Sequence, residues 1–186
     1  LIDCMEFMKG IPDKYYELAI VDPPYGIGAD NMVGGKGKNK QWVIGKNWDS
    51  NIPSNEYFNE LKRVSQNRII FGGNYFSLPI TKNWIVWDKG LYGKTSFSDG
   101  ELAWTSLDIG LRIAQIRYDG FLGADKYGRI HPTQKPVALY KWLLKNYAKP
   151  NDKIFDSHVG SGSIRIACHD MGFDFEGCEL DKDYWE

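Results

Sequence analysis

Short, continuous apolar runs alternate along the chain with segments in which apolar residues recur at helical spacing. The first pattern is typical of strands buried on both faces, and the second is typical of amphipathic helices. Strands are predicted at residues 17–21, 68–71, 84–87, 153–156 and 175–180, with weaker extended patterns at 101–105 and 110–118. Helices are predicted at residues 5–9, 53–64, 136–149 and 163–171. This alternation predicts an α/β fold built on one doubly wound, mostly parallel sheet.

The length and composition indicate a single domain across residues 1–186. No apolar run in the sequence is long enough to cross a membrane, and the mean hydropathy is -0.44. Three cysteines are too few for a disulfide framework, which favours a reducing, cytoplasmic location. The chain opens on Leu1 without a methionine or an apolar leader, so we expect that both of its ends have been trimmed.

The overall charge balance counts at first against nucleic acid as a partner. The chain carries 23 basic and 24 acidic side chains, for a net charge of -1, whereas a protein that simply coats nucleic acid is strongly basic. The aromatic content of 15% points the other way, because aromatic rings offer stacking surfaces for bases. Residues 27–50 are rich in Gly, Lys and Asn without lasting periodicity, and they are predicted to form a mobile loop.

A Gly-rich turn joins a predicted strand to a predicted helix within residues 154–163. Glycines there let backbone N–H groups approach a ligand closely, and the start of a helix favours a negative group such as a carboxylate. Glu179 follows the turn by about twenty residues, where an acid can accept hydrogen bonds from ribose hydroxyls. Arg165 replaces the third glycine of the dinucleotide motif, which makes an NAD-dependent oxidoreductase a weaker alternative. The pattern predicts a nucleotide-like ligand, with a tight turn that binds nothing as the alternative.

A second polar motif, Asp22-Pro23-Pro24-Tyr25, follows the predicted strand at residues 17–21. Consecutive prolines remove two N–H donors and leave carbonyl oxygens free to accept hydrogen bonds. The carboxylate adds an acceptor and the tyrosine adds a flat ring, which together suit a planar substrate with an exocyclic amino group. A proline-terminated turn with a surface tyrosine is the alternative. The carboxylate is nevertheless expected at the carboxyl edge of a parallel sheet, where such folds bind ligands.

These motifs together resemble those of the amino-methylating DNA methyltransferases that use S-adenosylmethionine. Residues 22–25 match the family's Asp-Pro-Pro-Tyr catalytic motif, and residues 156–163 resemble its Asp-Pro-Phe-x-Gly-Ser-Gly-Thr cofactor turn. Residues 131–136 are similar to its His-Pro-Thr-x-Lys-Pro segment. The catalytic motif precedes the cofactor turn, as it does in the permuted group often called beta. The resemblance therefore implies a seven-stranded sheet of the Rossmann-like methyltransferase type, circularly permuted.

The resemblance extends beyond these three motifs. Residues 48–49, 72–75 and 97–104 also look like phage-type and bacterial members of the family. The permuted order implies that the chain is cut where a helix would otherwise join two strands. Leu1 and Glu186 should then lie on neighbouring strands, with residues 1–2 at the end of one of them.

The resemblance also implies which residues form the site. Catalysis is assigned to Asp22, Pro23, Pro24 and Tyr25. Cofactor binding is assigned to residues from several parts of the chain, namely Asp3, Cys4, Thr133, Gln134, Lys135, Asp156, Ser157, His158, Gly160, Ser161, Gly162, Ser163, Glu179 and Leu180. Asp3 is equally a candidate for a helix N-cap. Ser157 and His158 replace the family's Pro-Phe, so an imidazole is expected where a phenyl ring would cover the cofactor.

The implied reaction is transfer of a methyl group from S-adenosylmethionine to the N6 amine of a flipped-out adenine in DNA. Tyr25 would stack on the base, while Asp22 and the carbonyl of Pro23 would accept the hydrogens of the amine. A run of lysines beside the catalytic motif is the expected phosphate contact, although such runs are usually only solvated loops. These lysines are Lys36, Lys38, Lys40 and Lys46. Residues 105–130, where a target-recognition domain is usually inserted, form only a short segment.

Other functions are weaker alternatives on the same residues. N4-cytosine methylation uses the same geometry, but that subgroup more often carries serine in place of Asp22. A protein-glutamine methyltransferase would carry asparagine there, and a non-catalytic DNA-binding subunit would not need both Asp22 and Tyr25. The histidines and cysteines lack the spacing of zinc-ligand pairs, so no metal is expected. DNA is the expected partner, and a homodimer or a paired restriction enzyme is left open.

Overall fold

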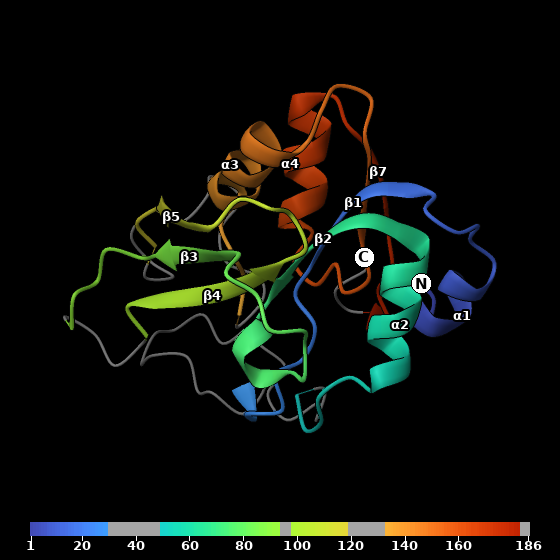
Figure 1. The fold of residues 1–186 in the computed structure, drawn as a ribbon, viewed down its shortest axis with the longest axis horizontal. Coiled ribbons are helices and arrows are strands. Elements are labelled where there is room, and N and C mark those ends of the chain that lie inside the picture. Colours follow the sequence, from blue (N-terminus) through green and yellow to red (C-terminus); the bar gives the residue numbers. More distant parts are fainter. Residues whose placement is uncertain (30–48, 94–97, 119–132, 183–186) are drawn as a thin grey trace.

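A seven-stranded sheet forms the centre of the part of the chain that the structure describes. The computed structural model describes residues 1–29, 49–93, 98–118 and 133–182. Its strands lie in the order β5-β3-β4-β2-β1-β6-β7 (Figure 1). They are β1 (Tyr16–Val21), β2 (Ser65–Phe71), β3 (Trp84–Asp88), β4 (Gly100–Thr105), β5 (Leu111–Gln115), β6 (Lys153–Asp156) and β7 (Asp174–Gly177). The predicted α/β fold with a seven-stranded sheet is confirmed.

Most neighbouring strands in this sheet are parallel. β1 pairs in parallel with β2 on one side and with β6 on the other. β6 with β7 and β3 with β5 are further parallel pairs. β4 is antiparallel to both of its neighbours, β2 and β3. The prediction of a mostly parallel sheet is therefore also confirmed.

Two pairs of helices cover the two faces of the sheet. The helices are α1 (Cys4–Lys9), α2 (Asn55–Val64), α3 (Val137–Tyr147) and α4 (Ser163–Met171). α1 contacts α2, and α3 contacts α4 (Figure 1). Along β1, Leu18 and Ile20 pack in the cluster that includes α3 and α4, whereas Ala19 and Val21 pack in the cluster that includes α1 and α2. Because both faces of β1 are buried, its sequence is a continuous apolar run rather than an alternating one.

The helices begin close to their predicted starts, and their caps explain the small differences. The Asp3 carboxylate accepts hydrogen bonds from the N–H groups of Met5 and Glu6, at 2.9 and 3.1 Å. The alternative role of Asp3 as a helix N-cap is therefore confirmed. Pro136 was predicted as the first residue of its helix, but its ψ of 144° is extended, so it is the N-cap and α3 begins at Val137.

Two strands differ in length from the prediction. β2 begins at Ser65, earlier than predicted, because its first residues pair with β1 through the backbone although their side chains are polar. β7 ends at Gly177, earlier than predicted. The next residue, Cys178, donates its N–H to the carbonyl of Asp156 and accepts the N–H of Val159, at 2.9 and 3.0 Å. The backbone after β7 is thus tied to the turn that follows β6.

The N-terminal segment lies beside the segment that follows β7, although residues 1–2 do not form the predicted strand end. The N–H of Ile2 donates to the carbonyl of Glu179 at 3.0 Å. Glu186, the predicted neighbour of Leu1, lies outside the described residues. So do the four lysines of the predicted DNA-facing loop and residues 119–130 of the predicted recognition segment. None of the helices in the described ranges has the length and apolar character needed to cross a membrane.

Candidate functional site

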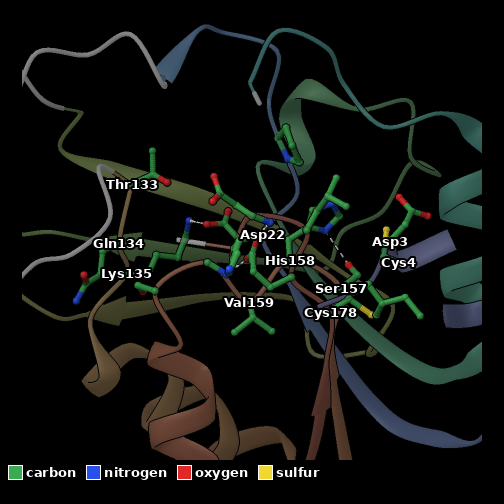
Figure 2. A pocket seen from close by; sticks show the side chains of 18 of the residues that line it. Asp3, Cys4, Asp22, Thr133, Gln134, Lys135, Ser157, His158, Val159 and Cys178 are labelled. Carbon is green, nitrogen blue, oxygen red and sulfur yellow. Dashed lines mark hydrogen bonds and ion pairs between the residues drawn. The ribbon is translucent and has the colours of Figure 1, made fainter. Parts of the chain in front are cut away.

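The pairing of β1 with β6 brings the two predicted motifs together. The strands are parallel, with Leu18 opposite Ile154, so their carboxyl ends reach the same edge of the sheet. Asp22 follows β1 directly, and the Gly-rich turn follows β6 directly. A cavity of about 670 Å³ opens at this edge, and both Asp22 and His158 line it (Figure 2).

Most of the predicted site residues line this cavity. They are Asp3, Cys4, Asp22, Pro24, Thr133, Gln134, Lys135, Ser157, His158, Gly160, Ser161, Glu179 and Leu180. Predicted residues that do not line it are Pro23, Tyr25, Asp156, Gly162 and Ser163. Lining residues that the sequence did not indicate are Ile2, Tyr140, Val159, Cys178, Asp181 and Lys182. All of these except Tyr140 lie within two residues of a predicted site residue along the chain, whereas Tyr140 lies on α3 and no sequence pattern indicated it.

The Gly-rich turn is held in place from both of its flanking strands. Gly160 and Gly162 have φ angles of 51° and 70°, a left-handed conformation that glycine adopts without strain. The Glu179 carboxylate accepts the N–H of Gly160 at 2.7 Å and the N–H of Asp181 at 2.8 Å. Each carboxylate oxygen keeps a lone pair for a further donor, so Glu179 both shapes the turn and offers acceptors to a ligand.

Asp156 supports the turn from beneath the cavity. Its carboxylate accepts the backbone N–H of His158 at 2.9 Å, and the side chain is buried. Burial raises the pKa of Asp156 to about 8, and the nearby charges of Asp22 and Glu179 add to the rise, against the opposing effect of the His158 N–H. Asp156 is therefore largely protonated at neutral pH, which reduces the negative charge packed beneath the turn.

A chain of hydrogen bonds sets the protonation of the imidazole in the cavity wall. The Tyr57 hydroxyl lies 2.7 Å from the Ser157 hydroxyl, which lies 2.8 Å from Nδ1 of His158 (Figure 2 draws the second bond). Among the described residues, the Tyr57 proton has only Ser157 as an acceptor, so Tyr57 donates to Ser157, and Ser157 donates to Nδ1. Burial lowers the pKa of His158 to about 4. The ring is therefore neutral, with its proton on Nε2.

Asp49 fixes the backbone that follows the catalytic motif. Its buried carboxylate accepts the N–H groups of Tyr25, Gly26 and Ala29, at 2.6, 2.9 and 2.7 Å. Three donors on one anion hold the loop in a single conformation. The sequence had marked residues 48–49 only as a likeness to the methyltransferases, and no local pattern indicated that Asp49 holds residues 25–29.

The Asp22 carboxylate is itself held from two sides. The Tyr25 hydroxyl donates to its Oδ1 at 2.5 Å, and the Lys135 ammonium pairs with its Oδ2 (Figure 2 draws only the pair with Lys135). Lys135 was predicted as a cofactor ligand. It lines the cavity, but its ammonium is directed at Asp22 and lies 3.2 Å from Glu101 as well.

The Tyr25 ring lies in an aromatic group beside the carboxylate. It stacks on Tyr75, with the ring centroids 5.1 Å apart and the planes inclined by 16°. Tyr75 belongs to the short 3₁₀ turn η2 (Gly73–Tyr75) that follows β2. A Cβ atom at Gly72 would lie 2.2 Å from the Tyr25 ring, and Gly72 has a φ of 68°, so this position requires glycine.

Replacement of Asp49 by alanine should loosen the loop that carries Tyr25. Three buried N–H groups would lose their acceptor, so we expect Asp49→Ala to lower the free energy of unfolding by about 2 kcal/mol or more in urea titrations. Asp108 is a matched control because it is highly exposed and, among the described residues, pairs with the exposed Lys82. Asp108→Ala should change the free energy by less than about 0.5 kcal/mol. Equal effects of the two substitutions would contradict the role of Asp49.

The raised pKa of Asp156 predicts a pH dependence of stability. The pKa of this carboxyl is about 8 in the folded chain and 3.8 ordinarily, so the folded state holds a proton that the unfolded state releases between these values. Stability contributed by this group is therefore complete below about pH 4 and is lost as pH rises towards 8. Urea titrations across this range should show a smaller loss for Asp156→Asn than for the wild type. If the free energy of unfolding falls with pH equally in the two proteins, the raised pKa of Asp156 is refuted.

Sequence comparison relates the chain to known DNA methylases. The model of a DNA methylase family, N6_N4_Mtase, matches residues 103–186. The putative methylase YubD of Escherichia coli K12 is 26% identical over 196 aligned residues, which cover 98% of this chain and 84% of YubD. The type II methyltransferase M1.MboII of Moraxella bovis is 23% identical, with 98% of this chain and 91% of that protein covered.

Solved structures of DNA methyltransferases have the same fold. A crystal structure of an M1.HpyAVI–SAM complex superposes with a TM-score of 0.60 at 20% identity, covering 98% of this chain and 93% of that one. The cytosine-N4-specific PvuII DNA methyltransferase superposes with a TM-score of 0.59 at 10% identity, covering 99% of this chain and 82% of that one. The chain is thus similar in sequence to DNA methylases and methyltransferases, and it shares the fold of these solved structures.

Proposed function

We propose that the protein transfers a methyl group from S-adenosylmethionine to the N6 amine of a flipped-out adenine in DNA. One observation carries this proposal. The carboxylate of the Asp-Pro-Pro-Tyr motif lines the same cavity as the Gly-rich turn and Glu179. A cavity with these three parts can hold a nucleoside-like methyl donor beside acceptors for an amine.

The residues around the cavity fit the cofactor in size and chemistry. A volume of about 670 Å³ is typical of sites for ligands of this size. The carboxylates of Asp3, Asp22, Glu179 and Asp181 line the cavity, and they suit a ligand with a positively charged sulfonium. The bound cofactor would supply a methyl group that is already activated for transfer.

Each part of the cavity would bind a different part of the cofactor. Glu179 would accept hydrogen bonds from the ribose hydroxyls, and the backbone of Gly160 and Ser161 would hold the methionine end. The neutral imidazole of His158 would offer its Nε2 proton without repelling the sulfonium. Because the Lys135 ammonium pairs with Asp22, Thr133 and Gln134 are the better candidates for the methionine carboxylate.

The catalytic motif would act on the target amine by orientation. Asp22 and the carbonyl of Pro23 would accept hydrogen bonds from the two N–H groups of the exocyclic amine, which directs its lone pair towards the methyl group. The N–CH3 bond would form as the S–CH3 bond breaks, S-adenosylhomocysteine would leave, and the methylated amine would release one proton to water. The base would stack on the aromatic group formed by Tyr25 and Tyr75, whose rings are nearly parallel. No covalent intermediate with the protein is needed, because the chain only has to place the amine and balance its developing charge.

DNA would be held by the lysines near the catalytic motif. Lys36, Lys38, Lys40 and Lys46 lie outside the described residues, and their proposed role rests on the sequence, in which residues 33–48 contain these lysines and no acid. Cationic side chains bind phosphates in any base sequence, so they would position the duplex without selecting the site. The proposal places this activity in the cytoplasm of a bacterium or of a phage-infected cell.

The adenine specificity rests on Asp22, because the cytosine-specific subgroup more often carries serine at this position. The cytosine-N4-specific PvuII enzyme shares this fold with a TM-score of 0.59, so the fold alone does not exclude N4-cytosine methylation. N4-cytosine methylation is therefore the second candidate, and the reaction product distinguishes the two.

The proposal is tested by incubating the protein with unmethylated genomic DNA and S-adenosylmethionine, and by mass spectrometry of the nucleosides. We expect N6-methyladenine from the wild type and at least about a 100-fold lower rate from Asp22→Ala, which loses the acceptor but keeps the cofactor site. Calorimetric binding of S-adenosylmethionine should be retained by this variant. Asp108→Ala should methylate like the wild type.

Two outcomes would count against the proposal. N4-methylcytosine as the product would overturn the adenine assignment and leave the enzyme class intact. A wild-type protein that binds S-adenosylmethionine without methylating DNA would overturn the DNA methyltransferase assignment itself.

A further inference from the structure

Behind the catalytic motif, four charged side chains form a row with alternating signs. Lys135 pairs with Asp22, its Nζ lies 3.2 Å from Oε2 of Glu101, and the Lys89 Nζ lies 2.7 Å from Oε1 of Glu101. The Lys135 side chain is only 3% exposed and that of Lys89 is 13% exposed. The row thus contains two anions and two cations, of which Lys135 is buried and the other three are partly buried.

The members of this row come from four separate parts of the sheet and its connections. Asp22 follows β1, Lys89 follows β3, Glu101 lies on β4, and Lys135 precedes α3. Lys135 also lies over the Phe71 ring, 4.7 Å from its centroid, which restricts where its ammonium can move. The arrangement therefore depends on the assembled sheet.

A contribution to stability does not by itself explain why these four charged side chains lie in a row. Desolvation of buried ions offsets most of their mutual attraction, and apolar residues of the same volume usually stabilise a core as well or better. Glu101 Oε2 is buried without a hydrogen bond among the described residues, although the Lys135 ammonium is near enough to attract it. A charged carboxylate oxygen that is buried without a hydrogen bond costs free energy, so its presence here indicates that the charge of Glu101 has a function.

We propose that Lys135 and Glu101 are positioning residues that hold the Asp22 carboxylate as an oriented anion for the target amine. This inference rests on the proposed function, since it concerns the residue assigned to the amine. Neither Lys135 nor Glu101 acts on the substrate itself. They act through Asp22, which is the group that meets the substrate.

The two residues have complementary effects on Asp22. Lys135 occupies Oδ2 and thereby fixes the plane of the carboxylate, while Tyr25 occupies Oδ1. Glu101 draws the same ammonium from the other side, so Lys135 does not fully neutralise Asp22. The carboxylate is therefore both immobilised and still a strong acceptor, and each oxygen keeps a lone pair for a hydrogen of the amine.

The charges around Asp22 give the two residues opposite effects on its titration. Burial raises the pKa of Asp22, Lys135 lowers it, Glu101 raises it and the Tyr25 hydroxyl lowers it. Two more groups face Asp22, Asp156 at the end of β6 and Tyr140 on α3, and the charge of Asp22 raises the pKa of both. Removal of Lys135 should therefore make Asp22 harder to ionise, and removal of Glu101 should make it easier to ionise.

The test is the pH dependence of kcat/KM for DNA methylation, compared among matched variants. We expect Lys135→Met to move the acid limb of the profile up by about one pH unit or more, and Glu101→Gln to move it down. Lys135→Arg keeps the charge, so its acid limb should stay near that of the wild type. Lys82→Met is the control, because it removes an exposed lysine whose ion pair in the described part of the chain is with exposed Asp108, and it should leave the profile unchanged.

Opposite shifts would not follow from a merely structural role, which predicts a lower rate at every pH. Acid limbs that coincide with the wild type in both Lys135→Met and Glu101→Gln, or that move in the same direction, would overturn the inference. Thermal unfolding and calorimetric binding of S-adenosylmethionine would show whether each variant folds. If Lys135→Met does not fold, the other two variants decide. A downward shift of the acid limb in Glu101→Gln, with an unshifted acid limb in Lys135→Arg, supports the inference. An unshifted or upward-shifted acid limb in Glu101→Gln overturns it.

The outcomes for the inference and for the proposed function are distinguishable. A wild-type protein that does not methylate DNA overturns the proposed function, and this inference with it. An active wild type whose variants share its acid limb overturns the inference alone.

Discussion

The parallel pairing of β1 with β6 is the constraint on which the rest of the site depends. It brings Asp22 and Asp156, far apart in the chain, to the same edge of the sheet. Both strands are buried on both faces, so their register is set by the core rather than by the site. The chain after β7 then returns to this edge, where Cys178 binds the turn and Glu179 reaches the cavity. One pair of strands therefore determines where an acceptor and a ligand-binding turn can meet.

Four acidic residues near this edge have different hydrogen-bond or ion-pair partners, and these partners fit different roles. Among the described residues, Asp49 binds backbone N–H groups and so acts on the shape of a loop. Glu179 binds two N–H groups and still lines the cavity. Asp156, with its raised pKa, holds the turn largely as a neutral acid. Among the described residues, Asp22 is the one of these four acids that pairs with a lysine, and this pairing favours its charged form beside the place where an amine would bind.

The strands, the helices and the two motifs could be predicted because each depends on the spacing of apolar residues, or on the residue types, within a short stretch of sequence. The run at β1 and the Gly-rich turn after β6 are of this kind, and both lie where they were expected. The partners of Asp22 could not be predicted in the same way. Lys135 was expected at the cofactor, and Glu101 was only part of a weak extended segment. Their pairing arises from strand order, because β4 inserts antiparallel between β2 and β3, and no local pattern encodes that order.

The central claim is that the cavity at the ends of β1 and β6 holds S-adenosylmethionine against Glu179. Calorimetric titration of the cofactor tests it most directly, with Glu179→Gln as the variant and exposed Glu6→Gln on α1 as the control. We predict that the wild type and Glu6→Gln bind alike, and that Glu179→Gln binds at least about tenfold more weakly because it loses a charged acceptor. No binding by the wild type, or equal binding by all three proteins, would contradict the account.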